Sequence, residues 1–212
     1  ILGISFSIVE LISSAIFLYW GRLSWASCRN WARIIRRRDD LAGNKMTGGL
    51  KIAVLTVSDS RTMEDDTSGQ FLCDELQAEG HCLSARQIVI DDLYDLRAIA
   101  SAWIADSEIE VILVTGGTGF TSRDSTPEAL AILFDVDITG FGELFRQLSF
   151  SEIGTSTVQS RAFAGIANNT IVFCMPGSTG ACKTAWTGIL RDQLDIDHRP
   201  CNFAELIRKG TH

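Results

Sequence analysis

A glycine-rich segment lies between an uncharged apolar run and the start of a predicted helix. The run Val111–Thr115 is typical of a strand buried on both faces, and Pro127 is typical of the first turn of a helix. Glycines let the backbone approach an anion closely, and the N–H groups at a helix start point toward it. We therefore expect a phosphate-binding loop formed by four successive residues: Gly116, Gly117, Thr118 and Gly119.

The same loop carries two charged residues that suit phosphate chemistry. Arg123 offers a fork of N–H donors, and Asp124 offers a carboxylate that can hold a metal ion or orient a nucleophile. The spacing excludes a P-loop, because no Lys follows the glycines. It excludes a dinucleotide fingerprint, because Thr121 and Ser122 follow where the third Gly should fall. A tight turn without a ligand is the alternative, and the two charged residues favour a phosphate site.

Further polar clusters follow the other predicted strands. Ser58, Asp59, Ser60 and Arg61 follow the first strand, and Asp91 and Asp92 follow the second. Gly177 and Ser178, within the segment 176–180, follow the last strand and open a helix. Ligands of an open parallel sheet bind outside the carboxyl ends of its strands, so these clusters should converge with the glycine-rich loop. Two carboxylates and two phosphate cradles at one edge suggest magnesium-assisted phosphoryl or nucleotidyl transfer.

Each of these clusters also has an ordinary structural explanation. The pair Asp91 and Asp92 is typical of a helix N-cap, because a helix is predicted from Leu93. Asp59 is equally typical of a turn, and Ser178 would cap a helix with or without a ligand. The sequence has neither a Ser–His–Asp order nor His and Cys at metal-binding spacing, so hydrolase and zinc functions have weak support.

Strands and helices alternate from Met46 onward in the pattern of apolar residues. This alternation implies right-handed crossovers and a mostly parallel sheet in an α/β fold. The predicted strands are 51–58, 83–90, 110–115 and 170–174. The predicted helices are 67–79, 93–106, 127–148 and 179–193, with Trp103 and Trp186 on buried stripes.

The charge is unevenly distributed along the chain, since residues 1–45 are basic and residues 46–212 are acidic. The 212 residues are 46% apolar and 21% charged, which allows a sizeable core. Residues 1–45 hold seven Lys or Arg and three Asp or Glu, which gives them a net charge of +4. Because the whole chain has a net charge of −7, residues 46–212 carry −11. An acidic body argues against nucleic acid as a partner. The six cysteines form no C-x-x-C pair, so we expect free thiols in a reducing compartment.

Residues 1–45 differ from the rest of the chain. Residues 1–20 form a near-continuous apolar run, broken by Glu10 and followed by arginines, which is also a pattern of membrane anchors. The first Met is Met46, shortly before the first clear strand. We interpret residues 1–45 as upstream sequence translated from a misplaced start and residues 46–212 as the functional domain. A membrane anchor is the alternative.

Taken together, the motifs resemble the MoaB/Mog molybdopterin-binding family. The resemblance covers about Leu50 to Ile207 and is carried by the segments TGGTG at 115–119, RDSTPE at 123–128, GFGE at 140–143 and PGS at 176–178. The segments 152–157, 159–161 and 198–203 are similar to the bacterial MoaB branch in particular. The resemblance implies a three-layer α/β/α sandwich that assembles into a homotrimer or a homohexamer.

The resemblance also implies an activity. Members of the family adenylylate molybdopterin, so that Mg-ATP and molybdopterin give adenylyl-molybdopterin and pyrophosphate during molybdenum cofactor biosynthesis. The two key aspartates of the family match Asp91 and Asp124, which would hold Mg²⁺ and orient the reacting groups. The residues expected to bind substrate or nucleotide are Ser58, Asp59, Gly116, Gly117, Thr118, Gly119, Arg123, Gly177 and Ser178.

The resemblance leaves two alternatives open. One is a non-catalytic, hexameric molybdopterin-binding protein of the same pathway, and the other is molybdate insertion by a protein that shares this domain. In each case the expected partners are the other enzymes of molybdenum cofactor biosynthesis, and the expected compartment is the cytoplasm.

Overall fold

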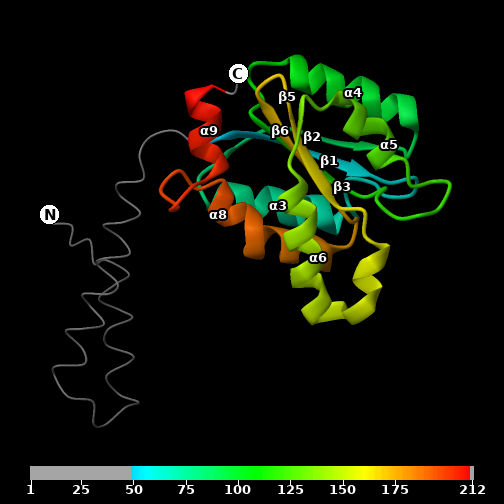
Figure 1. The fold of residues 1–212 in the computed structure, drawn as a ribbon. Coiled ribbons are helices and arrows are strands. Elements are labelled where there is room, and N and C mark those ends of the chain that lie inside the picture. Colours follow the sequence, from blue (N-terminus) through cyan, green and yellow to red (C-terminus); the bar gives the residue numbers. More distant parts are fainter. Residues whose placement is uncertain (1–48, 211–212) are drawn as a thin grey trace, which may run out of the picture. The chain divides into compact units, whose positions relative to one another are not determined.

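The computed structural model describes residues 49–210, and their central element is a six-stranded sheet (Figure 1). Its strands are β1 (Lys51–Val57), β2 (Cys82–Val89), β3 (Val111–Thr115), β4 (Val136–Asp137), β5 (Phe163–Ala167) and β6 (Thr170–Met175). They lie in the order β2-β1-β3-β6-β5-β4. The first four in this order are parallel, whereas β5 is antiparallel to both β6 and β4. The prediction of a mostly parallel sheet is confirmed, with an antiparallel edge added.

Helices cover both faces of this sheet (Figure 1). One face carries α3 (Thr67–Ala78), α6 (Thr139–Ile153), α7 (Thr179–Ala185) and α9 (Phe203–Lys209), and the other carries α4 (Leu93–Ala105) and α5 (Thr126–Leu130). α7 continues through a π-helical turn, Trp186–Leu190, into α8 (Arg191–Gln193), so the predicted helix 179–193 is confirmed in extent. The three-layer α/β/α arrangement expected from the sequence is confirmed.

The predicted helix 127–148 is wrong as one continuous element. After α5 the chain makes a 3-10 turn, Ala131–Leu133, and then adds β4 to the edge of the sheet before α6 begins. The N–H groups of Asp135 and Ile138 donate to the carbonyl groups of Ile166 and Ala164 in β5 at 2.8 Å each. These sheet hydrogen bonds compete with the helical ones. Because β5 was not predicted from the sequence either, its pairing partner could not be anticipated.

The core consists of two apolar layers, one on each face of the sheet. Side chains alternate along each central strand, so that Ile52 and Val54 of β1 face α3 and α7, whereas Ala53 and Leu55 face α4. β3 and β6 divide their residues in the same way. This two-sided burial explains why the central strands have continuous apolar sequences. Trp186 is fully buried, as predicted, and Trp103 packs at the margin of the α4 layer.

The described cysteines are free thiols, as expected. They are Cys73, Cys82, Cys174, Cys182 and Cys201, while Cys28 lies outside the described residues. Burial raises the pKa of Cys73 and of Cys182 to about 11, which keeps both thiols protonated at neutral pH. These two side chains therefore act as small apolar groups of the core.

The structure bears on the membrane-anchor alternative only in part. Within residues 49–210, no helix combines the length and the apolar character that crossing a bilayer requires. The apolar run at residues 1–20 and the boundary placed between residues 45 and 46 lie outside the described residues. Both therefore stay predictions.

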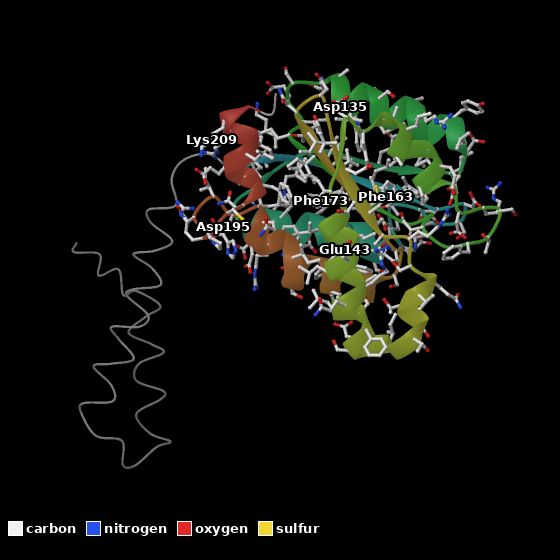
Figure 2. The ribbon with its side chains drawn as sticks, in the orientation of Figure 1. Asp135, Glu143, Phe163, Phe173, Asp195 and Lys209 are labelled. Atoms are coloured by element: carbon white, nitrogen blue, oxygen red, sulfur yellow. The ribbon has the colours of Figure 1, made fainter. Side chains whose placement is uncertain are left out.

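The aromatic side chain of Phe173 joins the sheet to the helices on one face (Figure 2). Its ring lies 5.1 Å from that of Phe141 in α6 and 5.8 Å from that of Phe203 in α9. We predict that Phe173→Ala lowers the free energy of unfolding by roughly 3–5 kcal/mol, because the core cannot close around so large a cavity. Urea denaturation of the variant measures the change.

Tyr94→Ala is the matched control for this prediction. Tyr94 is 71% exposed on α4, so its truncation should change stability by less than about 1 kcal/mol. Equal losses in the two variants would contradict the assignment of Phe173 to the centre of the core.

Candidate active site

A cavity of about 590 Å³ lies at the carboxyl ends of β1, β3 and β6. The glycine-rich loop after β3 and the loop after β6 form two of its walls, and α6 with the following 3-10 segment, Gly154–Gln159, forms a third. The predicted site residues that line it are Ser58, Gly116, Gly117, Thr118, Gly119, Asp124, Gly177 and Ser178. These residues come from three separate strand ends, which the parallel sheet brings to one edge.

The glycine-rich loop leaves β3 through two residues with positive φ. Gly116 has φ +113° and Gly117 has φ +63°, conformations that a side chain would strain. A Cβ atom on Gly116 would also lie 2.2 Å from the carbonyl oxygen of Val57. The Thr126 hydroxyl donates to the Gly116 carbonyl at 2.9 Å, so α5 holds the turn from its other end. The backbone therefore borders the cavity without side chains at Gly116 and Gly117.

Asp124 folds back onto the glycine-rich loop. Its Oδ1 accepts a hydrogen bond from the Gly119 N–H at 3.1 Å, and its Oδ2 accepts from the N–H and the hydroxyl of Thr121 at 2.8 and 2.6 Å. Partial burial opposes ionisation, but these hydrogen bonds outweigh it and lower the pKa of Asp124 below its usual range. The cavity therefore contains an ionised carboxylate at neutral pH.

The other three predicted residues lie beside the cavity instead of lining it. Asp59 pairs with Arg123 through Nε at 3.0 Å and Nη2 at 2.7 Å, and it accepts from the Asp91 N–H at 3.0 Å. The hydrogen bond from Arg123, followed by the one from the Asp91 N–H, lowers the pKa of Asp59. Asp91 in turn accepts from the N–H and the hydroxyl of Ser125. This network ties the ends of β1 and β2 to the glycine-rich loop.

The capping explanation of the acidic pair applies to one of its members. Asp92 is the N-cap of α4, because its carboxylate accepts from the N–H groups of Tyr94 and Asp95. Asp91 does not cap the helix. Its Oδ2 lies 2.6 Å from the position that a Cβ atom on Gly117 would occupy. The Asp91 carboxylate therefore abuts the glycine-rich loop directly.

A magnesium ion fits this set of donors only with substrate oxygens. Among the described residues, no group of three or more His, Cys, Asp or Glu side chains is arranged to hold a metal ion. Mg²⁺ commonly takes one or two carboxylates and completes its octahedron with water and phosphate oxygens. Asp91 and Asp124 border the glycine-rich loop at Gly117 and Gly119 and fit that pattern, but they do not form a preformed metal centre.

Arg161 was not assigned a role from the sequence, although its motif was noted. Its Nε donates to the Gly119 carbonyl and its Nη2 to the Asp124 carbonyl, both at 2.7 Å. It also pairs with Glu128 and lies 5.2 Å from the centre of the Phe120 ring. One guanidinium thus fastens both ends of the segment 119–124 to α5.

Behind the cavity lies a buried carboxylate that the sequence analysis also missed. Asp66 is the N-cap of α3 and accepts hydrogen bonds from the Gly69 N–H at 2.9 Å and the Thr56 hydroxyl at 2.8 Å. It is paired with Arg86 at 3.1 Å and more distantly with Arg61, which lines the cavity, at 3.5 Å. The capping position could have been read from the sequence, and Arg61 is close to Asp66 in the chain, but the partner Arg86 comes from β2 and could not be anticipated.

The third wall of the cavity could not be anticipated from local motifs. Residues 149–160 contribute several side chains, and the Thr184 hydroxyl donates to Glu152 at 2.7 Å, which links α6 to α7. The residues of this wall that line the cavity are Phe145, Ser149, Glu152, Ile153, Ser156, Gln159 and Ser160. Their contribution depends on how α6 packs against α7, which is a tertiary property.

Comparison with known proteins identifies the domain. Residues 53–196 match the family described as "Probable molybdopterin binding domain". The chain is 56% identical over 159 residues to Molybdenum cofactor biosynthesis protein B of Escherichia coli strain K12. The aligned region covers 75% of this chain and 94% of that protein.

Solved structures agree with this match. The crystal structure of a Molybdenum cofactor biosynthesis protein B superposes with a TM-score of 0.71 at 36% identity, over 77% of this chain and 98% of that one. The molybdopterin biosynthesis enzyme MoaB of Thermus thermophilus superposes with a TM-score of 0.61 at 26% identity, over 72% of this chain and 98% of that one.

The fold and the family match define an α/β protein with a molybdopterin-binding domain. The chain belongs to the MoaB family, the molybdenum cofactor biosynthesis protein B family.

We predict that the stabilising effect of Asp66 depends on pH. Burial raises its pKa, but hydrogen bonds from Gly69, Thr56 and Arg86 outweigh burial and leave the pKa below its usual range. A carboxyl with a depressed pKa stabilises the fold above its unfolded value of about 3.9 and loses this effect as the pH falls through the folded value. Asp66→Asn should therefore lower the free energy of unfolding by roughly 3–5 kcal/mol at pH 7, with a smaller difference below pH 4.

Urea denaturation of both proteins between pH 3 and pH 7 tests this expectation. The other carboxylates are the same in the two proteins, so the difference between the curves isolates Asp66. A difference that stays constant over this range would mean that the Asp66 side chain does not act through its charge.

We predict that Arg161 restrains the glycine-rich loop. In Arg161→Met, which keeps the apolar stem and removes the donors, hydrogen exchange at the Gly119 and Thr121 amides should accelerate at least about tenfold. Exchange followed by NMR measures these amides individually.

Arg97→Met is the matched control for the loop prediction. Arg97 donates to the carbonyl groups of Glu128 and Ala129 in α5 at 2.9 and 3.3 Å, so it loses two similar hydrogen bonds away from the loop. The same acceleration at Gly119 in both variants would show that α5 as a whole, and not Arg161, orders the loop.

Proposed function

We propose that this protein transfers an adenylyl group from Mg-ATP to molybdopterin and releases pyrophosphate. The observation that carries the proposal is the convergence of the Gly116–Gly119 loop and the ionised Asp124 on one cavity. Membership of the MoaB family supports molybdopterin as the acceptor. The cavity volume of about 590 Å³ suits a small molecule of the size of a nucleotide or a pterin.

The proposed reaction is a displacement at phosphorus. An oxygen of the molybdopterin phosphate attacks the α-phosphorus of ATP and forms a new P–O bond. The bond from the α-phosphorus to the oxygen that bridges to the β-phosphorus breaks, and pyrophosphate leaves with that electron pair. Bound Mg²⁺ would supply charge neutralisation on the phosphate oxygens. The phosphate nucleophile is already anionic at neutral pH, so the protein has to supply position and electrostatic stabilisation.

The residues at the cavity divide these tasks by their chemistry. The N–H groups of Gly117 and Thr118 would bind phosphate oxygens, whereas those of Gly116 and Gly119 already donate to the Met175 carbonyl and to Asp124. Asp91 and Asp124 would hold Mg²⁺ through the substrate phosphates. Gly177 and Ser178 would contact the pterin or its phosphate from the loop after β6. Ser58 would add a hydroxyl to the same wall, while the Asp59–Arg123 pair would position the nucleotide from beside the cavity.

A non-catalytic, molybdopterin-binding role is the second candidate. The observation in its favour is that both carboxylates already serve the protein itself, since Asp124 orders the glycine-rich loop and Asp91 anchors Ser125. Such carboxylates could be present for loop structure alone. The two candidates differ in one measurable property, the release of pyrophosphate.

We also propose a homotrimer or homohexamer in the cytoplasm, acting beside the other enzymes of molybdenum cofactor biosynthesis and without nucleic acid. The acidic charge of residues 46–212 opposes binding to nucleic acid. Exposed apolar side chains on α6 and the 3-10 segment after it support contact between subunits, namely Phe150, Ile153 and Val158. Sedimentation equilibrium gives the number of subunits, and a monomer would refute this assembly.

We predict that Asp124→Asn lowers the rate of molybdopterin-dependent pyrophosphate release by at least about 100-fold, because charge stabilisation of the transition state is lost. The assay combines Mg-ATP with and without molybdopterin. Asp74→Asn, an exposed substitution on α3 outside the cavity, is the matched control and should turn over normally.

The outcomes separate the two candidate functions. Normal turnover by Asp124→Asn would remove Asp124 from the mechanism. Tight binding of molybdopterin by the unsubstituted protein without any release of pyrophosphate would refute the transferase and leave the binding role.

A further inference from the structure

Arg61 occupies a distinctive place in the cavity. Among the described residues that line the cavity, it is the one with a positively charged side chain, and the charged residues beside it are Asp124 and Glu152. The predicted transferase site includes no role for Arg61. Phosphorylated substrates are negatively charged, so their binding in an acidic protein requires a positive charge at the cavity. The contacts of Arg61 decide whether its charge is available for this purpose.

The positive charge of Arg61 is not cancelled by its buried partner. Asp66 has a fully buried side chain, and its two oxygens already accept from Gly69, Thr56 and Arg86 at 2.8–3.1 Å. Arg61 lies farther away, with Nη1 at 3.5 Å from Oδ1. The cluster thus contains two guanidinium groups and one carboxylate. Arg86 is 13% exposed and Arg61 is 30% exposed, so the surplus charge reaches solvent mainly through Arg61.

The guanidinium of Arg61 is held in place with donors to spare. Its Nη1 donates to the Ser68 hydroxyl, which itself donates to Asp66. Within residues 49–210, no protein acceptor is hydrogen-bonded to its Nε or Nη2. A guanidinium fixed on one side with two free donors on the other is suited to an oxyanion with several oxygens.

The neighbouring elements are consistent with an anion at this position. Ser58 and Ser178 line the cavity beside Arg61, and Ser178 is the N-cap of α7. The hydroxyls of Thr67 and Thr179 lie 2.9 Å apart, which joins the starts of α3 and α7. The start of α3 is already capped by the Asp66 carboxylate, so the groups offered to an anion here are Arg61 and the hydroxyls of Ser58 and Ser178.

We propose that Arg61 forms a second phosphate subsite of the cavity, separate from the glycine-rich loop, and that Asp66 positions it. The ligand group is a terminal phosphate dianion, carried either by the pterin as a monoester or by the nucleotide as its last phosphate. This inference rests on the proposed function for the choice of these two substrates. The existence of the subsite rests on the cluster of Arg61, Asp66 and Arg86 alone.

Calorimetric titration of the full chain tests the subsite with three probes: inorganic pyrophosphate, Mg-ATP and molybdopterin. Arg61→Gln should weaken pyrophosphate binding about 10- to 100-fold, because charge-assisted hydrogen bonds are lost. Arg61→Lys keeps the charge but not the fork and should give an intermediate affinity. Arg191→Gln, at an exposed arginine on α8 outside the cavity, should bind as the unsubstituted protein does.

The two substrate probes identify the source of the phosphate. Weaker binding of molybdopterin alone by Arg61→Gln would place the pterin monoester on Arg61, and weaker binding of Mg-ATP alone would place the nucleotide there. Unchanged affinities for all three probes in Arg61→Gln, or no binding of any of them by the unsubstituted protein, would overturn the subsite. Thermal unfolding of Arg61→Gln should stay close to that of the unsubstituted protein, because Arg86 still pairs with Asp66.

The subsite and the proposed function can fail independently. Binding that depends on Arg61 without release of pyrophosphate would refute the transferase and leave the subsite standing. Normal pyrophosphate release by the unsubstituted protein, together with equal binding of the three probes by Arg61→Gln, would refute the subsite and leave the transferase standing.

Discussion

The close approach of the β3 exit to the end of β1 is the constraint on which the candidate site depends. At Gly116 the chain passes so near the Val57 carbonyl that no side chain fits, and its positive φ then turns the backbone away from the sheet. This turn places the following N–H groups at the sheet edge and directs the chain into the segment that carries Asp124. The loop that lines the cavity and leads to Asp124 and α5 begins at this contact.

The charges at this edge are organised mainly by hydrogen bonds to the backbone. Asp124 accepts from Gly119 and Thr121, Asp91 accepts from Ser125, and Asp66 accepts from Gly69. Each carboxylate therefore orders a loop or a helix start at the same time as it supplies negative charge. The arginines complement them, since Arg161 fastens the loop carbonyls and Arg123 pairs with Asp59. A rigid site results from segments that are themselves irregular.

Much of the fold could be predicted because the central strands are buried on both faces. Continuous apolar runs such as Val111–Thr115 identified β1, β3 and β6, and helix periodicity identified α3, α4 and α7. The edge strands β4 and β5 were missed for the opposite reason. β4 has two residues, both exposed, and β5 has an antiparallel pairing that no local pattern indicates, so the segment before α6 was wrongly predicted as helix.

The sequence by itself determined the glycine-rich loop, the residues at the strand ends and the family. These features depend on residue type and short spacing, which a linear chain displays directly. Only the tertiary structure decided which strand-end residues line the cavity, that Asp92 and not Asp91 caps α4, how the Arg61 guanidinium is held, and that Arg161 joins the site. These features depend on side-chain contacts between residues far apart in the chain, such as Arg161 with Gly119 and Arg86 with Asp66. Such contacts exist only once the sheet and helices have packed, because packing decides which side chains come within contact distance and which of them line the cavity.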